Sequence, residues 1–132
     1  MNERVRARVQ RALADKLEPG ETVELVVFSH SGPVFYDPIL SLVNMINIAR
    51  GKTQGRALIL TDRRVLDARA NVVGSIKRVI NAWPRGSAPI AVDAERGRGR
   101  LTVDGEESSF RGLADVAREL VRLGSGTRRD DQ

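Results

Sequence analysis

The sequence predicts a mainly β (α+β) domain in which about seven short antiparallel strands form a partly open barrel or sandwich between two helices. Short apolar runs alternate with polar turns from residue 22 to residue 110, and an amphipathic helical pattern stands at each end of that stretch. The clearest hairpin pattern is 57–67, where the polar residues 61–64 separate two apolar runs. These three observations give the fold class.

The central turn combines a threonine and an aspartate with two arginines. Thr61 and Asp62 favour a turn because their side-chain oxygens bond nearby backbone N–H groups. Arg63 and Arg64 then begin the return strand, and we expect their aliphatic stems to lie along the sheet with the charged groups in water.

The N-terminal segment 3–17 is predicted to be an amphipathic helix. Its apolar residues recur at helical spacing, and Pro19-Gly20 follows the last turn as a terminator. The β-rich stretch from Thr22 to Ser29 is predicted to be the first strand.

A second helix is predicted in an insertion at 37–49, where Asp37-Pro38 provides an N-cap followed by a helix-starting proline. Only three polar residues interrupt the segment, so its apolar arc covers most of the circumference. Burying these side chains gains about 1.5–3 kcal/mol each. The sequence leaves three alternatives for what covers this apolar face: the chain's own sheet, a second subunit, or a membrane surface. The apolar residues of the insertion are Ile39, Leu40, Leu42, Val43, Met45, Ile46 and Ile48.

The remaining chain is predicted to contain four more strands and a final helix. Leu113–Leu123 carries a broad apolar face, and Gly124 is placed to end that helix. We therefore expect one domain at 1–124, with the barrel at 22–110 and a disordered tail at 125–132. The predicted strands are 75–80, 89–93, 101–103 and 107–110, the intervening turns 81–86 and 96–100, and the last helix 112–123.

The charge is concentrated in the middle of the chain. Residues 50–100 hold twelve Lys/Arg against four Asp/Glu, whereas the whole chain has a net charge of +5. A basic surface of this kind attracts anionic partners such as lipid headgroups or nucleic acid, although hairpin turns collect solvated arginines for structural reasons as well. With no apolar leader pattern and no transmembrane-length run, we expect the protein to be cytoplasmic, with peripheral membrane attachment as the alternative.

The residue types present give little support for catalysis or metal binding. The chain has no cysteine and a single histidine, His30, which excludes a thiolate site and the two-histidine metal motifs. Ser29 and His30 are neighbours on a predicted strand and point to opposite faces. We therefore expect no enzyme activity, no metal, no cofactor and no small-molecule substrate.

Several of these segments resemble the bacterial pleckstrin-homology-like domains, the PH-like or GRAM-like superfold that includes the YokE-type proteins. The resemblance covers roughly residues 17–123 and is carried by Leu17-Glu18-Pro19-Gly20-Glu21, Leu60-Thr61-Asp62-Arg63-Arg64-Val65-Leu66, Leu101-Thr102-Val103, Phe110 and the helix Leu113–Leu123. It implies a non-enzymatic module that binds lipid headgroups, peptides or further copies of itself. The connection between the first two strands departs from the lipid-binding pattern, because it carries an apolar helix in place of a short basic loop.

The sequence leaves three binding functions to compare. Protein–protein contact or self-association would use the interface candidates Ile39, Leu42, Val43 and Ile46. Binding to anionic membrane lipid would use the apolar helix with the adjacent basic residues. Weak nucleic-acid binding would use aromatic side chains that stack on bases, and the chain has few of them. Trp83 near Arg85 is the one suggestive pair, and we expect Trp83 to be a core residue. The anion-binding candidates are Arg50, Lys52, Arg56, Arg63, Arg64, Lys77 and Arg78; the nucleic-acid reading adds Arg96, Arg98 and Arg100.

Overall fold

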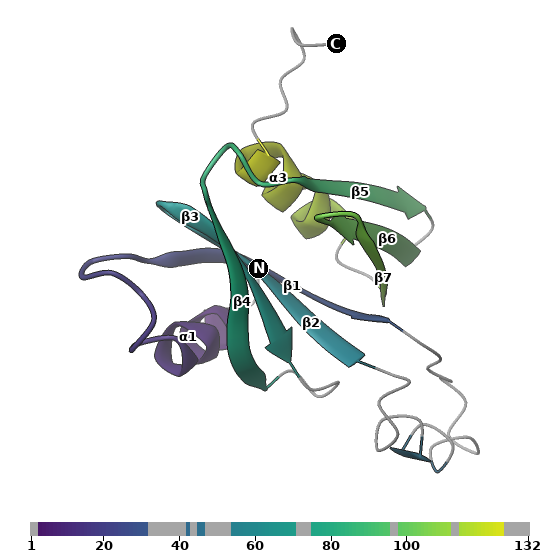
Figure 1. Ribbon diagram of the computed structural model, residues 1–132, viewed down its shortest axis with the longest axis horizontal. Helices are drawn as coiled ribbons and strands as arrows, with labels where there is room; N and C mark the ends of the chain where they lie inside the picture. The colour runs from purple at the N-terminus through teal and green to yellow at the C-terminus, as the bar shows by residue number, and fades with distance from the viewer. Residues whose placement is uncertain are drawn as a thin grey trace, which may run out of the picture.

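The computed structural model describes residues 3–31, 42, 45–46, 54–70, 75–95, 98–111 and 114–125. Seven antiparallel strands form one sheet in the order β4-β3-β2-β1-β7-β6-β5, with a helix near each end of the chain (Figure 1). The elements are α1 (Glu3–Ala12), β1 (Val23–Ser31), β2 (Gln54–Thr61), β3 (Arg64–Ala70), β4 (Ile76–Pro84), β5 (Ile90–Glu95), β6 (Arg98–Val103), β7 (Glu106–Arg111) and α3 (Ala114–Ser125).

The sheet is not closed, so the barrel expected from the sequence is present only as an open, curved sheet. β4 and β5 are its two edges. The seam between β1 and β7 is narrow, since His30 opposite Ser109 is the one register pair among the described residues, whereas β2 and β3 pair along six positions. The two parts of the sheet, β4-β3-β2-β1 and β7-β6-β5, are therefore held together by side chains and by α3 as well as by backbone hydrogen bonds.

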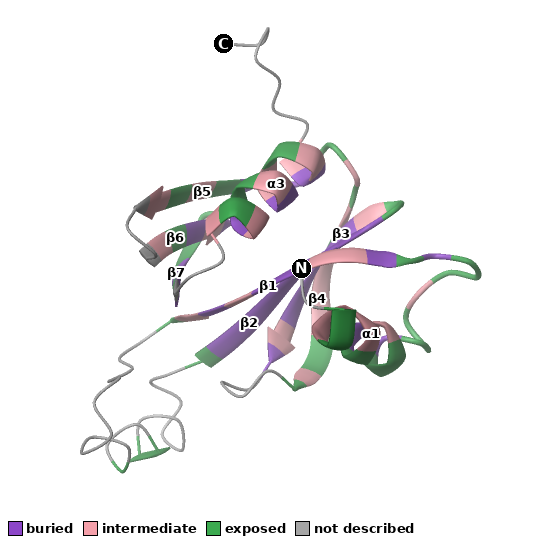
Figure 2. Ribbon diagram, turned by 180° about the vertical axis from the view of Figure 1, so that it is seen from behind, coloured by how far each residue is buried: buried purple, intermediate pink, exposed green. Residues whose placement is uncertain are grey.

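Alternation along the strands divides the core between the two faces of the sheet. On β2, Leu58 and Leu60 belong to the cluster under α3, and Ala57 and Ile59 belong to the cluster under α1. Figure 2 shows the consequence, because β2 is buried along almost its whole length. A strand covered on both sides reads as a continuous apolar run, which is why the sequence locates it so clearly.

Three local predictions are wrong. α1 ends at Ala12, and the chain continues to Leu17 in hydrogen-bonded turns that still bury Leu13. The segment 81–84 belongs to β4, and 98–100 belongs to β6, where turns were expected. Backbone pairing with β3 and β5 holds these residues in strands although their own composition favours turns.

Gly124 lies inside α3 and does not end it. A Cβ atom at this position would lie 2.7 Å from Cγ2 of Val65 and 3.1 Å from Cδ1 of Ile90. The carbonyl of Gly124 also accepts hydrogen bonds from the backbone of Gly86 and Ala88. The glycine is needed because the helix approaches the sheet closely here.

Candidate functional site

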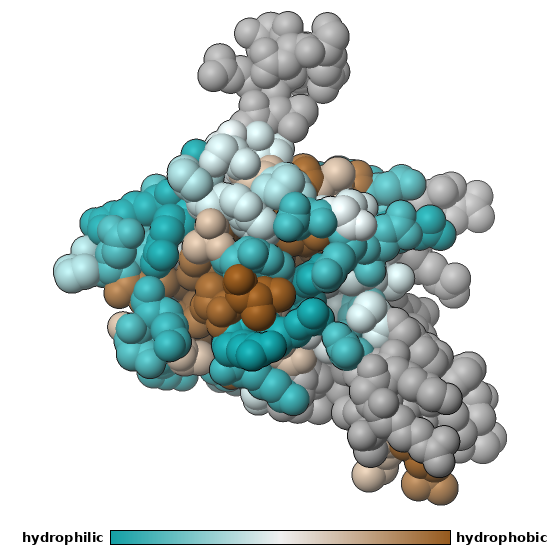
Figure 3. All heavy atoms as spheres, in the orientation of Figure 1, coloured by the Kyte–Doolittle hydropathy of each residue, from teal (hydrophilic) through white to brown (hydrophobic). Residues whose placement is uncertain are grey.

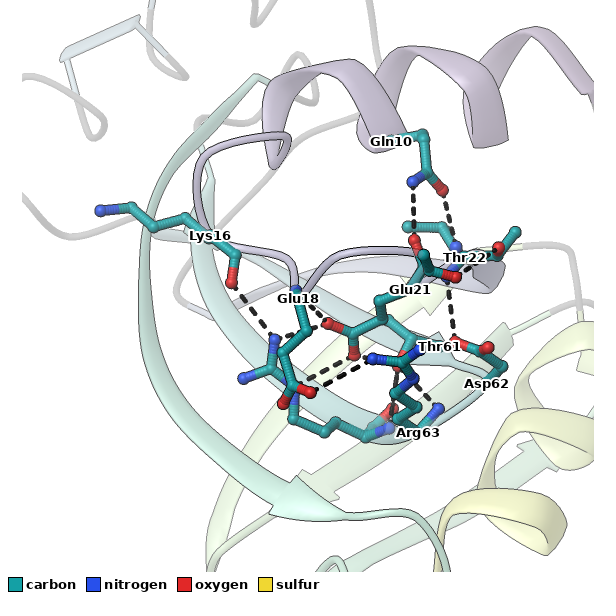
Figure 4. A network of polar contacts seen from close by, with 11 residues as sticks. Gln10, Lys16, Glu18, Glu21, Thr22, Thr61, Asp62 and Arg63 are labelled. Carbon is teal, nitrogen blue, oxygen red and sulfur yellow. Dashed lines mark hydrogen bonds and ion pairs between the residues drawn. The ribbon is translucent and has the colours of Figure 1, made fainter.

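The end of the sheet at the β2–β3 turn carries a buried ionic network (Figure 4). The Glu21 carboxylate, 3% exposed, accepts hydrogen bonds from Arg64 at 2.7 and 3.0 Å and from the Thr61 hydroxyl at 2.6 Å. Backbone N–H of Glu18 donates to the same carboxylate at 2.9 Å. The guanidinium of Arg64 is thus paired with a buried acid, and the prediction that it stands in water is wrong.

Neighbouring groups complete this network. Arg63 forms an ion pair with Glu18 at 3.2 Å, and Asp62 accepts a hydrogen bond from backbone N–H of Thr22 at 3.0 Å. The hydrogen bond from Arg64, more than the opposing effect of burial, lowers the pKa of Glu21 to about 2. The network joins the segment after α1 to the β2–β3 turn, so its role is structural.

At the opposite end of β2 and β3, Arg56 lies between two carboxylates. Its Nε is 3.0 Å from Oδ1 of Asp67, and its Nη2 donates to Glu106 on β7. Arg56 and Asp67 are almost fully buried, and burial raises the pKa of Asp67 although Arg56 opposes that shift. The Arg56–Glu106 contact crosses the narrow β1–β7 seam. Arg56 is therefore occupied by intramolecular partners.

Beyond this end of the sheet lie the described residues of the insertion. Leu42 and Met45 are each 66% exposed and Ile46 is 44% exposed, and all three have helical backbone. Figure 3 shows a brown group of spheres at the lower right, where Figure 1 draws the described part of the insertion. They are the large apolar side chains that stand out as exposed in the described part of the chain. We call these three side chains the apolar tip.

Two basic side chains at the start of β4 lie at the same end of the sheet. Lys77 and Arg78 are exposed, and neither forms an ion pair with another described residue. Arg69 on β3, which pairs with Arg78 in register, donates to Gln54 at 2.9 Å. The apolar tip and these cations are thus on one end of the molecule.

The predicted site residues fall into three groups. Leu42, Ile46, Lys77 and Arg78 are exposed, the first two in the insertion and the other two at the start of β4. Arg56, Arg63 and Arg64 are held in ion pairs. The candidates that lie outside the described residues are Ile39, Val43, Arg50, Lys52 and Arg96.

Three further residues singled out by the sequence or the structure are Trp83, Ser29 and Met45. Trp83 is half-buried and packs against the cluster under α3, as expected of a core tryptophan. Ser29 is buried and accepts a hydrogen bond from Ser108 at 2.8 Å. Met45 was not among the interface candidates, although its spacing of three residues from Leu42 is a helical-face signal.

No described helix combines the length and the apolar content needed to cross a bilayer. In the part of the chain that the structure describes, no group of three acidic, histidine or cysteine side chains is placed to hold a metal ion. Comparisons of the chain with protein-family models, with curated proteins and with solved structures give no significant match.

Proposed function

We propose that this protein is a non-enzymatic binding or scaffold module of PH-like fold that acts through protein–protein contact or self-association. The exposure of Leu42, Met45 and Ile46 supports this function most directly. The strand order with a C-terminal helix against the sheet is consistent with a PH-like domain.

The three side chains of the apolar tip occupy positions i, i+3 and i+4, the spacing of one helix face. Covering their exposed fractions of 66%, 66% and 44% would gain about 3–5 kcal/mol before the entropic cost of association, since a whole side chain gains roughly 1.5–3 kcal/mol. Exposed apolar side chains gathered in one place are typical of contact surfaces. A second copy, which brings an identical tip, is the simplest protein partner for such a surface.

Self-association is tested by light scattering after size exclusion over a range of concentrations. The parent chain is expected to form a defined oligomer, and Leu42→Asp is expected to be a folded monomer because a carboxylate cannot be buried in an apolar contact without a partner. Ala14→Asp is the matched control, since it adds the same charge at an exposed turn residue. A parent chain that stays monomeric at high concentration would refute self-association, and Leu42→Asp then serves in a pull-down for a different protein partner.

Binding to an anionic membrane surface is the second candidate function, and the observation that favours it is the exposed pair Lys77 and Arg78, which form no ion pair with another described residue and stand at the start of β4, at the same end of the sheet as the insertion. Each basic residue near such a surface contributes about 1 kcal/mol, and apolar side chains add to this by inserting at the interface. Flotation with vesicles containing anionic lipid at low salt is the test. Lys77→Gln/Arg78→Gln should lower the bound fraction, and absence of parent binding would remove this candidate.

Nucleic-acid binding through the basic middle segment receives less support. Arg63 and Arg64, two of the basic residues named for nucleic-acid binding, are engaged with Glu18 and Glu21. Lys77, Arg78 and Arg100 are described and exposed, but none has an exposed aromatic side chain beside it in sequence.

A further inference from the structure

The seam between β1 and β7 has the least backbone pairing in the described sheet. His30 opposite Ser109 is the one register pair there among the described residues, whereas β1 and β2 pair along eight positions and β6 and β7 along six. The part β7-β6-β5 is therefore joined to the part β4-β3-β2-β1 by few backbone hydrogen bonds. Segments with few such bonds are the ones that open most readily in a native protein.

Two side-chain links cross this seam. The Ser108 hydroxyl on β7 donates a hydrogen bond to the Ser29 hydroxyl on β1 at 2.8 Å, and both residues are buried. The second link is Arg56 on β2, whose Nη2 donates to Glu106 on β7. Because β1 lies between β2 and β7, the Arg56 side chain reaches across a whole strand, over its small register partner Ser29.

The two ends of the Arg56 link differ in burial. Arg56 is 5% exposed, and its Nε lies 3.0 Å from Oδ1 of Asp67, which is 1% exposed. Asn81 donates to Oδ2 of the same carboxylate at 3.2 Å, so the β3 end of the link is fixed. The Glu106 side chain is 62% exposed, and an ion pair with an exposed carboxylate is weakened by water and salt. Glu106 is therefore the end of the link that releases first.

The apolar core limits how far the seam can open. Leu58 and Leu60 on β2 belong to the same buried cluster under α3 as Leu101 on β6 and Phe110 on β7. Separating the two parts of the sheet completely would expose all of these side chains to water, which the hydrophobic effect opposes. An opening at the seam is thus confined to the contact between β1 and β7, with the core still packed.

We propose that β7 separates locally from β1 in the folded protein and that the Arg56–Glu106 pair is the clasp that controls this opening. With the pair formed, Arg56 and the Ser29–Ser108 hydrogen bond hold β7 against β1. When Glu106 leaves Arg56, the buried pair of Arg56 with Asp67 stays in place and the facing edges of β1 and β7 reach solvent. This conformational device goes beyond the binding function of the apolar tip and does not depend on it.

The test uses the absence of cysteine from the chain. Ser108→Cys places a single thiol on the β7 side of the seam at a residue that is 5% exposed. Ala70→Cys places one on β3 at a residue that is 4% exposed and belongs to the cluster under α1. A buried thiol reacts with a small aromatic disulfide only after the protein opens around it. Labelling rates of the full-length variants are measured in water and in low urea, because urea accelerates an opening in proportion to the surface that it exposes.

The thiol at position 108 is expected to react at least about tenfold faster than the thiol at position 70, at a rate that urea barely changes. Adding Glu106→Gln to Ser108→Cys should raise the labelling rate about fivefold, the effect of losing one partly exposed ion pair. The matched control is Glu107→Gln, which removes the same charge from an exposed residue that forms no ion pair with any described residue. Its labelling rate should stay within about twofold.

Equal rates and equal urea dependence for the two thiols would overturn the local opening. A Glu106→Gln effect no larger than that of Glu107→Gln would overturn the role of the clasp. Ser29→Cys, on the β1 side of the seam at a residue that is 6% exposed, repeats the measurement if the Ser108→Cys chain does not fold. Circular dichroism of each variant confirms that the fold is retained.

Discussion

The two ends of the sheet differ in how their side chains are partnered. At the β2–β3 turn, Glu21 is buried and bonded to Arg64 and Thr61. At the insertion end, Leu42, Met45 and Lys77 are exposed to solvent. Groups that are satisfied within the chain contribute to stability, whereas groups left without an internal partner are available for binding. The comparison therefore predicts that substitutions in the buried network at the turn lower the free energy of unfolding and that substitutions of these exposed side chains at the insertion end change association.

The largest loss of stability is expected for Glu21→Ala. The substitution leaves the Arg64 guanidinium and the Thr61 hydroxyl without their buried acceptor, and breaking such a pair costs about 3 kcal/mol. Urea unfolding followed by circular dichroism measures the effect. Glu18→Ala is the control, because the exposed pair with Arg63 is worth less than about 1 kcal/mol. Equal losses for the two variants would contradict the structural role assigned to Glu21.

Lowering the pH should remove the stabilisation that the ionised Glu21 carboxylate gives the parent chain. The pKa of Glu21 is about 2 in the folded protein and 4.5 in its ordinary state. A lowered pKa stabilises the fold above the ordinary value, and this stabilisation, on the order of 2–3 kcal/mol, is lost as the pH falls from about 4.5 to about 2.

The measurement for this pH dependence is urea unfolding of the parent and of Glu21→Gln from neutral pH down to pH 2. The difference in unfolding free energy between the two chains should shrink in acid, because Glu21 is then protonated and neutral like glutamine. A difference that stays constant over the whole range would show that Glu21 does not titrate as described.

A smaller effect is expected where α3 meets the sheet. Gly124→Ala places a Cβ atom 2.7 Å from Cγ2 of Val65, and the clash should cost about 1–2 kcal/mol after the gain in helix propensity. A double-mutant cycle with Val65→Ala measures it, since removing the Val65 methyl groups should relieve most of the loss. If Gly124→Ala costs the same in both backgrounds, the Val65 contact is not its cause.

The sequence predicts the strands better than it predicts their partners. The β2–β3 hairpin is local in the chain, and the double-sided burial of β2 leaves a continuous apolar run that periodicity detects. Glu21 and Arg64 are 43 residues apart, so no local pattern reveals their contact. Gly124 likewise resembles a helix terminator until the closeness of Val65 is known.

The candidate site was predictable only where its signal is local in the sequence. The excess of apolar residues in the insertion is a local property, and it led to Leu42 and Ile46. Whether a cation such as Arg56 or Lys77 is paired depends on strands that are distant in sequence. Composition alone therefore grouped buried Arg56 with exposed Lys77 as equivalent candidates.

The central claim, that the apolar tip is a binding surface and not part of the core, is tested most directly by the stability of Leu42→Asp. Urea unfolding at low protein concentration, where association contributes little, compares this variant with the parent. The expected difference is less than about 0.5 kcal/mol, as for exposed substitutions in general. A loss of about 2 kcal/mol or more would contradict the account, because it would mean that Leu42 is buried within its own chain.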